Sequence, residues 1–170
     1  MSESSRVPLL VAAALAIALP SVLALWSWLA WGGELPESVG THWSSSGPAD
    51  RTTPTGEFFA ATFTVSTVTG GVGTVVAVIP RVHANGRRLA LLALGSVSAI
   101  AAVQWLVSAG LTLHARDPHS AVLGAWILAI FGSFAYGVIP FLLAPPKSTG
   151  QHSPDTHISP QPSRPRRECS

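Results

Sequence analysis

The sequence has few charged residues and almost no cysteine. Of its 170 residues, 11% are Asp, Glu, Lys or Arg, against roughly 25% in an average soluble domain, and this excludes an ordinary water-soluble globular fold. Ten basic and eight acidic residues leave a formal net charge of +2, so the basic surface typical of nucleic-acid binding is missing. A single cysteine, Cys169, excludes an intrachain disulfide and does not support a cysteine metal cluster or a thiol active site.

Charged residues are absent from four long intervals of the chain. These intervals contain 27, 23, 25 and 27 residues, at positions 7–33, 58–80, 89–113 and 120–146. About 20 helical residues cross a hydrocarbon core of about 30 Å, and one charge at the centre of such a helix costs about 2.5–3.5 kcal/mol. The apolar runs do not alternate with polar residues as barrel strands do. A soluble bundle is disfavoured because a chain this short cannot enclose four helices that are apolar on every side.

The four intervals predict an all-α fold. We expect a multi-pass integral membrane protein whose four transmembrane helices form one domain over residues 1–146. The predicted spans are 8–31, 58–80, 89–113 and 120–144. Residues 147–170 contain four prolines among Ser, Thr, Gln and Arg, a composition too polar to form a core, so we expect a disordered cytoplasmic tail there.

Basic residues near the ends of the spans predict the orientation. Basic residues lie before the first span (Arg6), between the second and third spans (three arginines within residues 81–88) and in the tail (four basic residues). The connection between the first and second spans is acidic instead. The third connection has one Arg and one Asp. Because Lys and Arg accumulate in cytoplasmic loops, we expect both termini to be cytoplasmic, and residues 34–57 and 114–119 to lie outside the plasma membrane.

The first span has a second interpretation as a cleaved secretory signal peptide. Arg6 precedes an apolar run that Pro20 interrupts, and the small residues of Val22-Leu-Ala24 are similar to a cleavage site. The apolar run continues through the tryptophans of residues 25–31. Tryptophans suit a membrane interface, and this continuation favours a retained helix.

Small and hydroxylated residues recur within the spans at intervals of four, which places them on one face of a helix. They are Thr62, Ser66, Gly70 and Thr74 in the second span, Gly95 and Ala99 in the third, and Ser133 and Gly137 in the fourth. Such faces let helices pack closely in lipid. A small-solute transporter, with Gln104 and nearby hydroxyls lining a polar path, is the alternative. Transport routes usually contain ionisable groups, however, and the spans contain no Asp, Glu, Lys, Arg or His.

The first outer connection is longer than a link between helices requires and carries a spaced motif. It reads Leu35-Pro36-x-x-Val39-x-Thr41-His42-Trp43-x-x-x-Gly47-x-x-Asp50. This spacing resembles the signature of the bacterial domain of unknown function 1648 (DUF1648), which also occurs in membrane proteins related to the SdpI immunity protein. With the flanking parts of two spans, the similar segment covers residues 15–60.

The resemblance implies a multi-pass bacterial membrane protein with this loop outside the cell and a role in immunity or envelope signalling. The chain departs from the family after Asp50, where Arg-Thr-Thr-Pro-Thr-Gly replaces a segment similar to Trp-Gly-Ser-Lys. It also has fewer predicted spans than the longer immunity proteins.

The residues of the loop themselves favour a structural or a recognition role. Leu35, Val39 and Trp43 recur every four residues and predict a short turn docked at the membrane interface, with Trp43 at headgroup level and His42 pointing elsewhere. The alternative is a surface that recognises a peptide or protein partner. The motif residues that would contribute to either role are Leu35, Pro36, Thr41, His42, Trp43, Gly47 and Asp50.

A metal site is the third interpretation of the outer loops. His42, His114 and His119 lie on the same side in the predicted topology, and imidazoles and carboxylates such as those of Asp50 and Asp117 are ligands that zinc accepts. No HExxH pair supports such a site, and no nucleophile elbow or phosphate loop occurs.

The sequence therefore predicts a non-enzymatic membrane protein without a cofactor. Its expected partners are the lipid bilayer and a membrane or extracellular peptide or protein, and no nucleic acid. A metal-dependent membrane enzyme that uses the outer-loop histidines is the alternative, beside the small-solute transporter.

Overall fold

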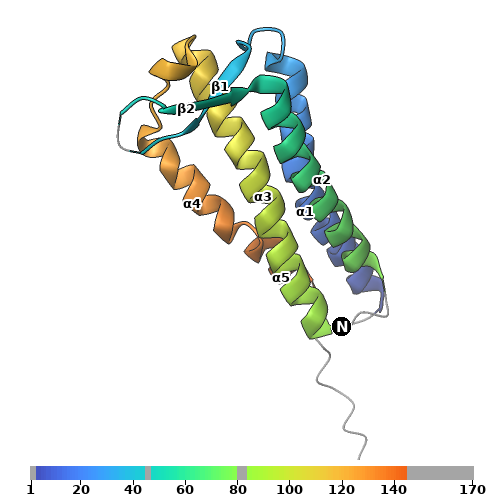
Figure 1. The fold of residues 1–170 in the computed structure, drawn as a ribbon. Helices are drawn as coiled ribbons and strands as arrows, with labels where there is room; N and C mark the ends of the chain where they lie inside the picture. The colour runs from blue at the N-terminus through green and yellow to red at the C-terminus, as the bar shows by residue number, and fades with distance from the viewer. Residues whose placement is uncertain (1–2, 45–46, 80–83, 145–170) are drawn as a thin grey trace, which may run out of the picture.

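The computed structural model describes residues 3–44, 47–79 and 84–144. The predictions for the tail, 147–170, lie outside the described residues. Four helical segments are long and apolar enough to cross a membrane (Figure 1). They are Val7–Trp31, Thr55–Val78, Asn85–Ala115 and Gly124–Leu143. The prediction of four apolar helices is thus confirmed.

A small sheet lies between the first two helices and departs from the predicted all-α fold. The elements in chain order are α1 (Glu3–Trp31), β1 (Ser38–His42), β2 (Arg51–Pro54), α2 (Thr55–Val78), α3 (Ala84–Ala115), the 3-10 turns η1 (Pro118–Ser120) and η2 (Gly124–Trp126), α4 (Ile127–Ala135) and α5 (Val138–Leu143). The strands lie at one end of the helices, which we call the hairpin end, and α1 begins at the opposite, N-terminal end (Figure 1).

The central helix of the bundle is α3. In the most apolar stretch of 18 residues in α3, 44% of the residues are buried, whereas the share is 17% to 22% in the corresponding stretches of the other three segments. It contacts α1, α2, α4 and α5. With 32 residues it is about 48 Å long at 1.5 Å per residue, which exceeds a hydrocarbon core of about 30 Å. Its length lets α3 carry Arg87 and Arg88 at the N-terminal end and still reach the hairpin at the other.

Small residues bring α2 close to α1 and α3, as their fourfold spacing predicts. Ser66 and Gly70 are buried. The Ser66 hydroxyl is hydrogen-bonded to Ser21 of α1 at 2.9 Å and to Ser98 of α3 at 3.1 Å. A Cβ atom on Gly70 would lie 3.1 Å from the carbonyl oxygen of Ile17. Three hydroxyls and one glycine therefore hold three helices together in the middle of the bundle.

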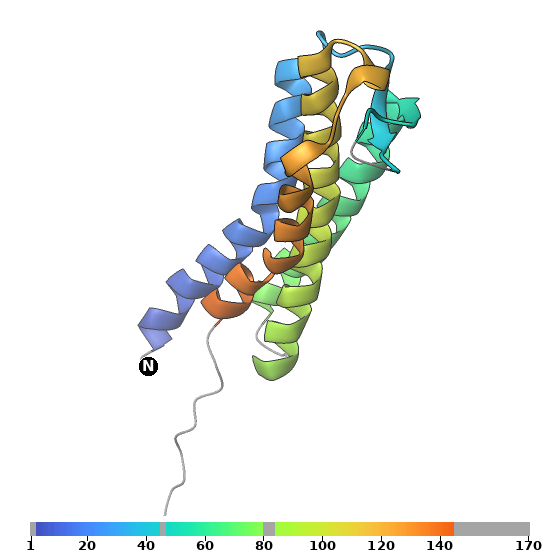
Figure 2. The same cartoon turned by 90° about the vertical axis from the view of Figure 1, so that its left-hand side faces the viewer.

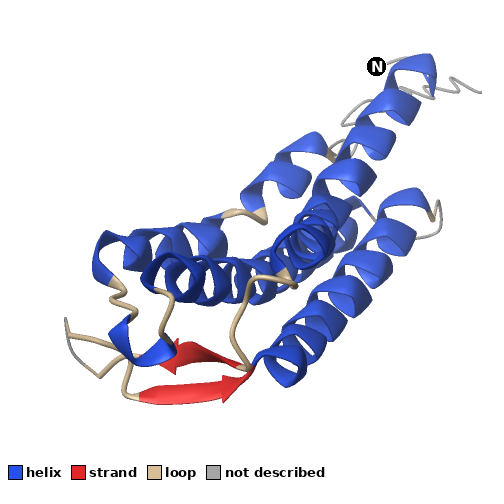
Figure 3. Ribbon diagram, turned by 90° about the horizontal axis from the view of Figure 1, so that it is seen from above, coloured by secondary structure: helices blue, strands red, loops and turns tan. Residues whose placement is uncertain are grey.

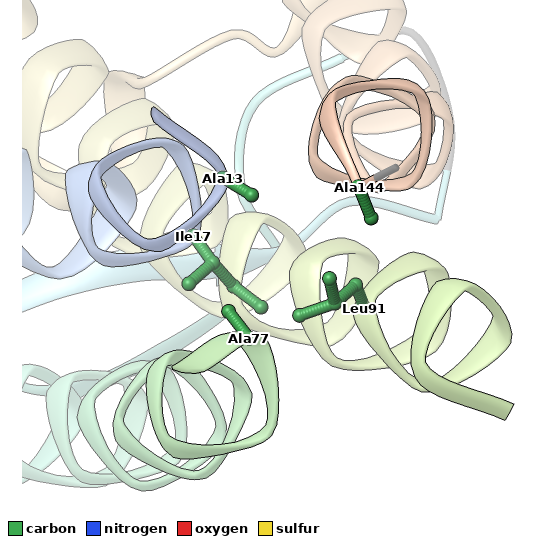
Figure 4. Close-up of a cluster of buried hydrophobic side chains, with 5 residues drawn as sticks. All are labelled: Ala13, Ile17, Ala77, Leu91 and Ala144. Atoms are coloured by element: carbon green, nitrogen blue, oxygen red, sulfur yellow. The ribbon is translucent and has the colours of Figure 1, made fainter. Parts of the chain in front are cut away.

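Apolar side chains fill the bundle in two clusters. The cluster towards the N-terminal end consists of Ala13, Ile17, Ala77, Leu91 and Ala144 (Figure 4). The cluster towards the hairpin end surrounds Trp105, which is fully buried. The indole nitrogen of Trp105 donates to the Ser27 hydroxyl at 2.8 Å, and its ring lies 5.0 Å from that of Phe59 and 5.7 Å from that of Trp28. Aromatic rings thus join α1, α2 and α3 below the hairpin.

The fourth apolar segment is interrupted, whereas the sequence predicts one continuous span over residues 120–144. α4 ends at Ala135 and α5 begins at Val138. Gly137 lies at this break, where a Cβ atom would collide with the carbonyl oxygen of Leu92 in α3. α4 contacts α3, and α5 contacts both α1 and α3. Glycine at the break permits the close approach to α3.

Tyr136 connects the same break to the proline of α1. Pro20 has no N–H, so the carbonyl of Ala16, four residues earlier, lacks the donor that a regular helix provides. The Tyr136 hydroxyl donates to that carbonyl oxygen at 2.7 Å. α1 changes direction along its length in Figure 2, as expected for a helix with an internal proline. A side chain from the fourth segment therefore satisfies the polar group that the proline leaves open.

Candidate functional site

The connection between α1 and α2 forms a β-hairpin. β1 and β2 pair antiparallel, with Val39 opposite Thr53 and Gly40 opposite Thr52, and the register shifts before His42. The two strands lie side by side, and β2 leads into α2 (Figure 3). The hairpin thereby brings the residues of the spaced motif onto one end of the bundle.

The structure places Val39 within β1, with Leu35 before the strand and Trp43 directly after it. Val39 is fully buried, Leu35 packs on the aromatic cluster, and Trp43 is half-buried, so the spacing of four identifies residues that turn inward. Residues four apart share a face in a strand as well as in a helix. The spacing alone therefore did not distinguish the two structures.

Hydrogen bonds dock the hairpin on α3 and on the segment that follows it. The Gly40 N–H donates to the buried Thr112 hydroxyl of α3 at 3.1 Å. The Trp43 indole and the Ala49 N–H both donate to the carbonyl oxygen of Ala121, at 2.8 and 3.0 Å. A Cβ atom on Gly40 would lie 2.9 Å from the Ala49 side chain, so the close contact requires glycine at that position.

A second set of hydrogen bonds closes the base of the loop. The Thr55 hydroxyl donates to the Pro36 carbonyl oxygen at 2.6 Å, and the Thr55 N–H donates to the backbone carbonyl oxygen of Glu37 at 2.9 Å. Within the hairpin, the hydroxyls of Thr41 and Thr53 are hydrogen-bonded at 2.9 Å. These contacts join the first residue of α2 to the chain leaving α1 and link the two strands of the hairpin.

His42 and Asp50 form a hydrogen bond on the exposed side of the hairpin. His42 Nδ1 lies 2.6 Å from Asp50 Oδ1, and the two side chains are 55% and 40% exposed. The Ser44 N–H donates to Asp50 Oδ2 at 3.1 Å, and the Asp50 N–H donates to the His42 carbonyl at 3.0 Å. Hydrogen bonds from Ser44 and His42 lower the pKa of Asp50 to about 2. The carboxylate is therefore charged and held in place at neutral pH.

The motif residues thus divide into two groups. Leu35, Pro36, Thr41 and Trp43 are engaged in the packing and hydrogen bonds that fold and dock the loop. Gly47 leads into Pro48, which bridges to Val122. His42 and Asp50 bond to each other while their side chains stay open to solvent, so they are available to a partner.

His114 and His119 do not join this pair in a cluster of potential metal ligands. Asp117 Oδ1 accepts from the His119 N–H at 3.1 Å and Asp117 Oδ2 from the Ser120 hydroxyl at 2.6 Å, and these bonds, the one from Ser120 first, lower the pKa of Asp117. His114 lines an apolar cleft at the end of α3. Over residues 3–44, 47–79 and 84–144, no three His, Cys, Asp or Glu side chains gather as metal ligands.

The polar path proposed for a transporter also lacks support where it was expected. Ser66 is fully buried, and its hydroxyl is used in the bonds to Ser21 and Ser98. Gln104 is half-buried and lines neither the cleft beside Val103 nor the pocket beside Arg116, which are described below. Ser66 thus serves the contact between helices.

Sequence reasoning missed a cleft of about 560 Å³ between α3, α4 and the end of α1. Its α3 side consists of apolar residues three and four apart, such as Val103, Val107 and Gly110. The same pattern is expected of any buried helix face. It could not indicate that α4 would leave this face partly uncovered.

Comparison with protein-family models, with curated proteins and with solved structures finds no match to this chain. The likeness of the loop motif to DUF1648 therefore stays a prediction. The function has to be argued from the geometry of the hairpin and the helices below it.

Proposed function

We propose that the chain is a non-enzymatic, four-pass protein of the bacterial plasma membrane that recognises a peptide or protein outside the cell through its hairpin. Both termini are then cytoplasmic. The four apolar helices support insertion in a membrane, and the motif's resemblance to DUF1648 supports a role in immunity or envelope signalling.

The distribution of tryptophan and arginine supports this orientation. All six tryptophans lie in the hairpin, at the end of α1, in the second half of α3 or in η2, and tryptophan favours the membrane interface. At the opposite end, Arg88 Nε donates to the Phe141 carbonyl at 3.2 Å, and its guanidinium lies 4.1 Å from the centre of the Phe141 ring. Arginine is typical of the cytoplasmic side.

The observation that carries the recognition role is the exposed His42–Asp50 pair on a docked hairpin. Binding residues are often found on loops that a rigid scaffold positions. Here the hydrogen bonds to Thr112 and Ala121 supply the scaffold, and Ser44 and His42 fix the carboxylate of Asp50. A partner therefore meets a preorganised charged acceptor beside an imidazole, which reduces the entropy lost on binding.

Growth protection tests the recognition role. A strain lacking the protein is challenged with medium conditioned by its parent, which contains the peptides and proteins that the parent secretes. We expect the wild type and His119→Ala to restore growth, and His42→Ala and Asp50→Asn to fail, at equal protein levels in the membrane. His119→Ala is the matched control because it removes an exposed imidazole from the same end. Equal growth with all four forms would contradict the proposal.

Cysteine labelling tests the orientation separately. In a Cys169→Ser background, Ser44→Cys places the one thiol on the exposed hairpin, and Gly86→Cys places it at the exposed start of α3. We expect a membrane-impermeant maleimide to label position 44 in intact cells and position 86 only after permeabilisation. The reverse pattern would contradict the proposed topology.

A further inference from the structure

The cleft between α3 and α4 is open on one side and almost entirely apolar. Its volume of about 560 Å³ falls in the range of about 300–1,000 Å³ that is usual for sites of small ligands. The described residues that line it include Trp31, Val103, Leu106, Gly110, His114 and Trp126. His114, at the hairpin end of α3, is the one ionisable side chain among them.

The length of the cleft matches one leaflet of a bilayer. Val103 and His114 mark its two ends on α3, and eleven residues of helix rise about 16 Å. Half of a hydrocarbon core of about 30 Å is about 15 Å. Trp31 and Trp126 line the cleft near its hairpin end, at the depth that tryptophan prefers in membranes. The cleft therefore follows the path of a lipid chain from the interface towards the bilayer centre.

A second pocket of about 370 Å³ lies at the same end of α3 and carries both signs of charge. It is lined by Glu34, Leu35, Pro36, Leu113 and Arg116. On α3, Leu106, Gly110 and Leu113 follow at intervals of four and three, which place them on one face of the helix. Leu106 and Gly110 belong to the apolar cleft and Leu113 to the second pocket, so the two are lined by one continuous stripe.

The charges at this mouth fit a zwitterionic headgroup. Glu34 and Arg116 are both exposed and line the same pocket, yet no ion pair joins these two described residues. A phosphate pairs with the guanidinium of Arg116, since arginine binds phosphate with two parallel hydrogen bonds. A primary ammonium pairs with the carboxylate of Glu34. An anionic headgroup without an ammonium would leave Glu34 next to a like charge.

We propose that the apolar cleft and the mouth formed by Glu34 and Arg116 bind one phospholipid of the outer leaflet, with an acyl chain along α3 and a phosphoethanolamine headgroup at the mouth. The proposal rests on the membrane insertion and orientation proposed above. The lipid covers apolar surface of α3 that α4 leaves open. It also contacts Leu35 and Pro36, so the bound lipid lies against the base of the hairpin.

Native mass spectrometry of the full chain tests the proposal. The protein is released from nanodiscs that contain phosphatidylethanolamine and phosphatidylglycerol with the same acyl chains in equal amounts. We expect wild type to retain one phosphatidylethanolamine, and Gly110→Leu to lose it by about tenfold or more, equivalent to about 1.4 kcal/mol. A Cβ atom on Gly110 would meet no atom of another helix within 4 Å, so the substitution adds apolar volume on the side of α3 that faces the cleft.

Matched variants separate the cleft and its mouth from the rest of the surface. Gly71→Leu alters an exposed glycine of α2 that also has open space around it, and it should retain the lipid. Arg116→Asn and Glu34→Gln should each abolish the preference over phosphatidylglycerol. Asparagine is chosen because Arg116 has a φ of 58°, a conformation that asparagine tolerates.

The outcomes distinguish this site from the proposed orientation. Equal lipid retention by wild type, Gly110→Leu and Gly71→Leu would overturn the cleft as the site. Equal retention of the two lipids by wild type would overturn the headgroup assignment. Either result with normal labelling at position 44 would leave the four-pass topology standing, whereas reversed labelling would place the mouth in the inner leaflet and refute the outer-leaflet assignment.

Discussion

Replacement of Tyr136 by phenylalanine should destabilise the bundle through a carbonyl group on a different helix. The variant removes the hydroxyl that donates to Ala16 at 2.7 Å and keeps the ring. Hydrogen bonds between helices in a membrane contribute about 0.6 kcal/mol on average and at most about 1.7 kcal/mol. Because Pro20 deprives the Ala16 carbonyl of its helical donor, we expect a value in the upper half of that range, about 1–1.5 kcal/mol.

A double-mutant cycle with Pro20→Ala isolates this contribution. Alanine at position 20 supplies an N–H that can bond to the Ala16 carbonyl within α1. The Tyr136→Phe substitution should then cost close to nothing through this bond, and the cycle should show a coupling of about 1 kcal/mol. Any packing change caused by the loss of the proline ring is common to both arms of the cycle and is subtracted.

The free energy of unfolding can be measured by steric trapping of the purified protein in bicelles. Ser96→Ala provides a matched control. It removes a hydroxyl that donates to the backbone carbonyl oxygen of Phe134 in α4 at 2.7 Å, a different acceptor from the Ala16 carbonyl. The Ser96→Ala substitution should lower the free energy of unfolding by the same amount whether position 20 is proline or alanine. If Tyr136→Phe also costs the same in both backgrounds, the proposed link between the proline and the tyrosine is refuted.

Three further results are expected. Because hydrogen bonds lower the pKa of Asp50 from 3.8 to about 2, the stabilisation of the hairpin by the ionised carboxylate is complete above the unfolded pKa and is lost as the pH falls through the folded one. The ¹⁹F resonance of 5-fluorotryptophan at Trp43 should therefore shift in this window in wild type and not in Asp50→Asn. Gly137→Ala should lower the free energy of unfolding by about 1–3 kcal/mol, because its Cβ collides with the Leu92 backbone, whereas Gly132→Ala, with open space around it, should not; equal effects would contradict the close packing at the break. Trp105→Ala should cost about 3–5 kcal/mol as a buried aromatic residue, and Trp26→Ala, at 62% exposure, should cost far less in the same assay.

The apolar helices could be predicted from the sequence because each corresponds to a long interval without charged residues. Intervals without charge are rare by chance, and all four appear as helical segments. The small residues Ser66 and Gly70 were also predictable, because close packing requires small side chains whichever helices meet. Features that depend on composition or on spacing within one helix were therefore accessible.

The hairpin and the break in the fourth segment were not predictable in the same way. The spacing of Leu35, Val39 and Trp43 suits a strand as well as a helix. The hydrogen-bond acceptors that dock the hairpin lie far away in the chain. Thr112 is 72 positions from its donor Gly40, and Ala121 is 78 positions from its donor Trp43. The spacing of Gly137 from Ser133 indicated close packing of the fourth segment. Nothing in that spacing indicated the direction that α4 takes.

The carbonyl oxygen of Ala121 is a shared anchor for two otherwise separate parts of the chain. It accepts from Trp43 and from Ala49 of the hairpin loop, and the residues after it lead through η2 into α4. The short segment from Ala121 to η2 therefore links the position of the hairpin to the apolar segment with the smallest buried share. If the hairpin binds its partner outside the cell as proposed, we expect this link to change the tilt of α4 when the partner binds.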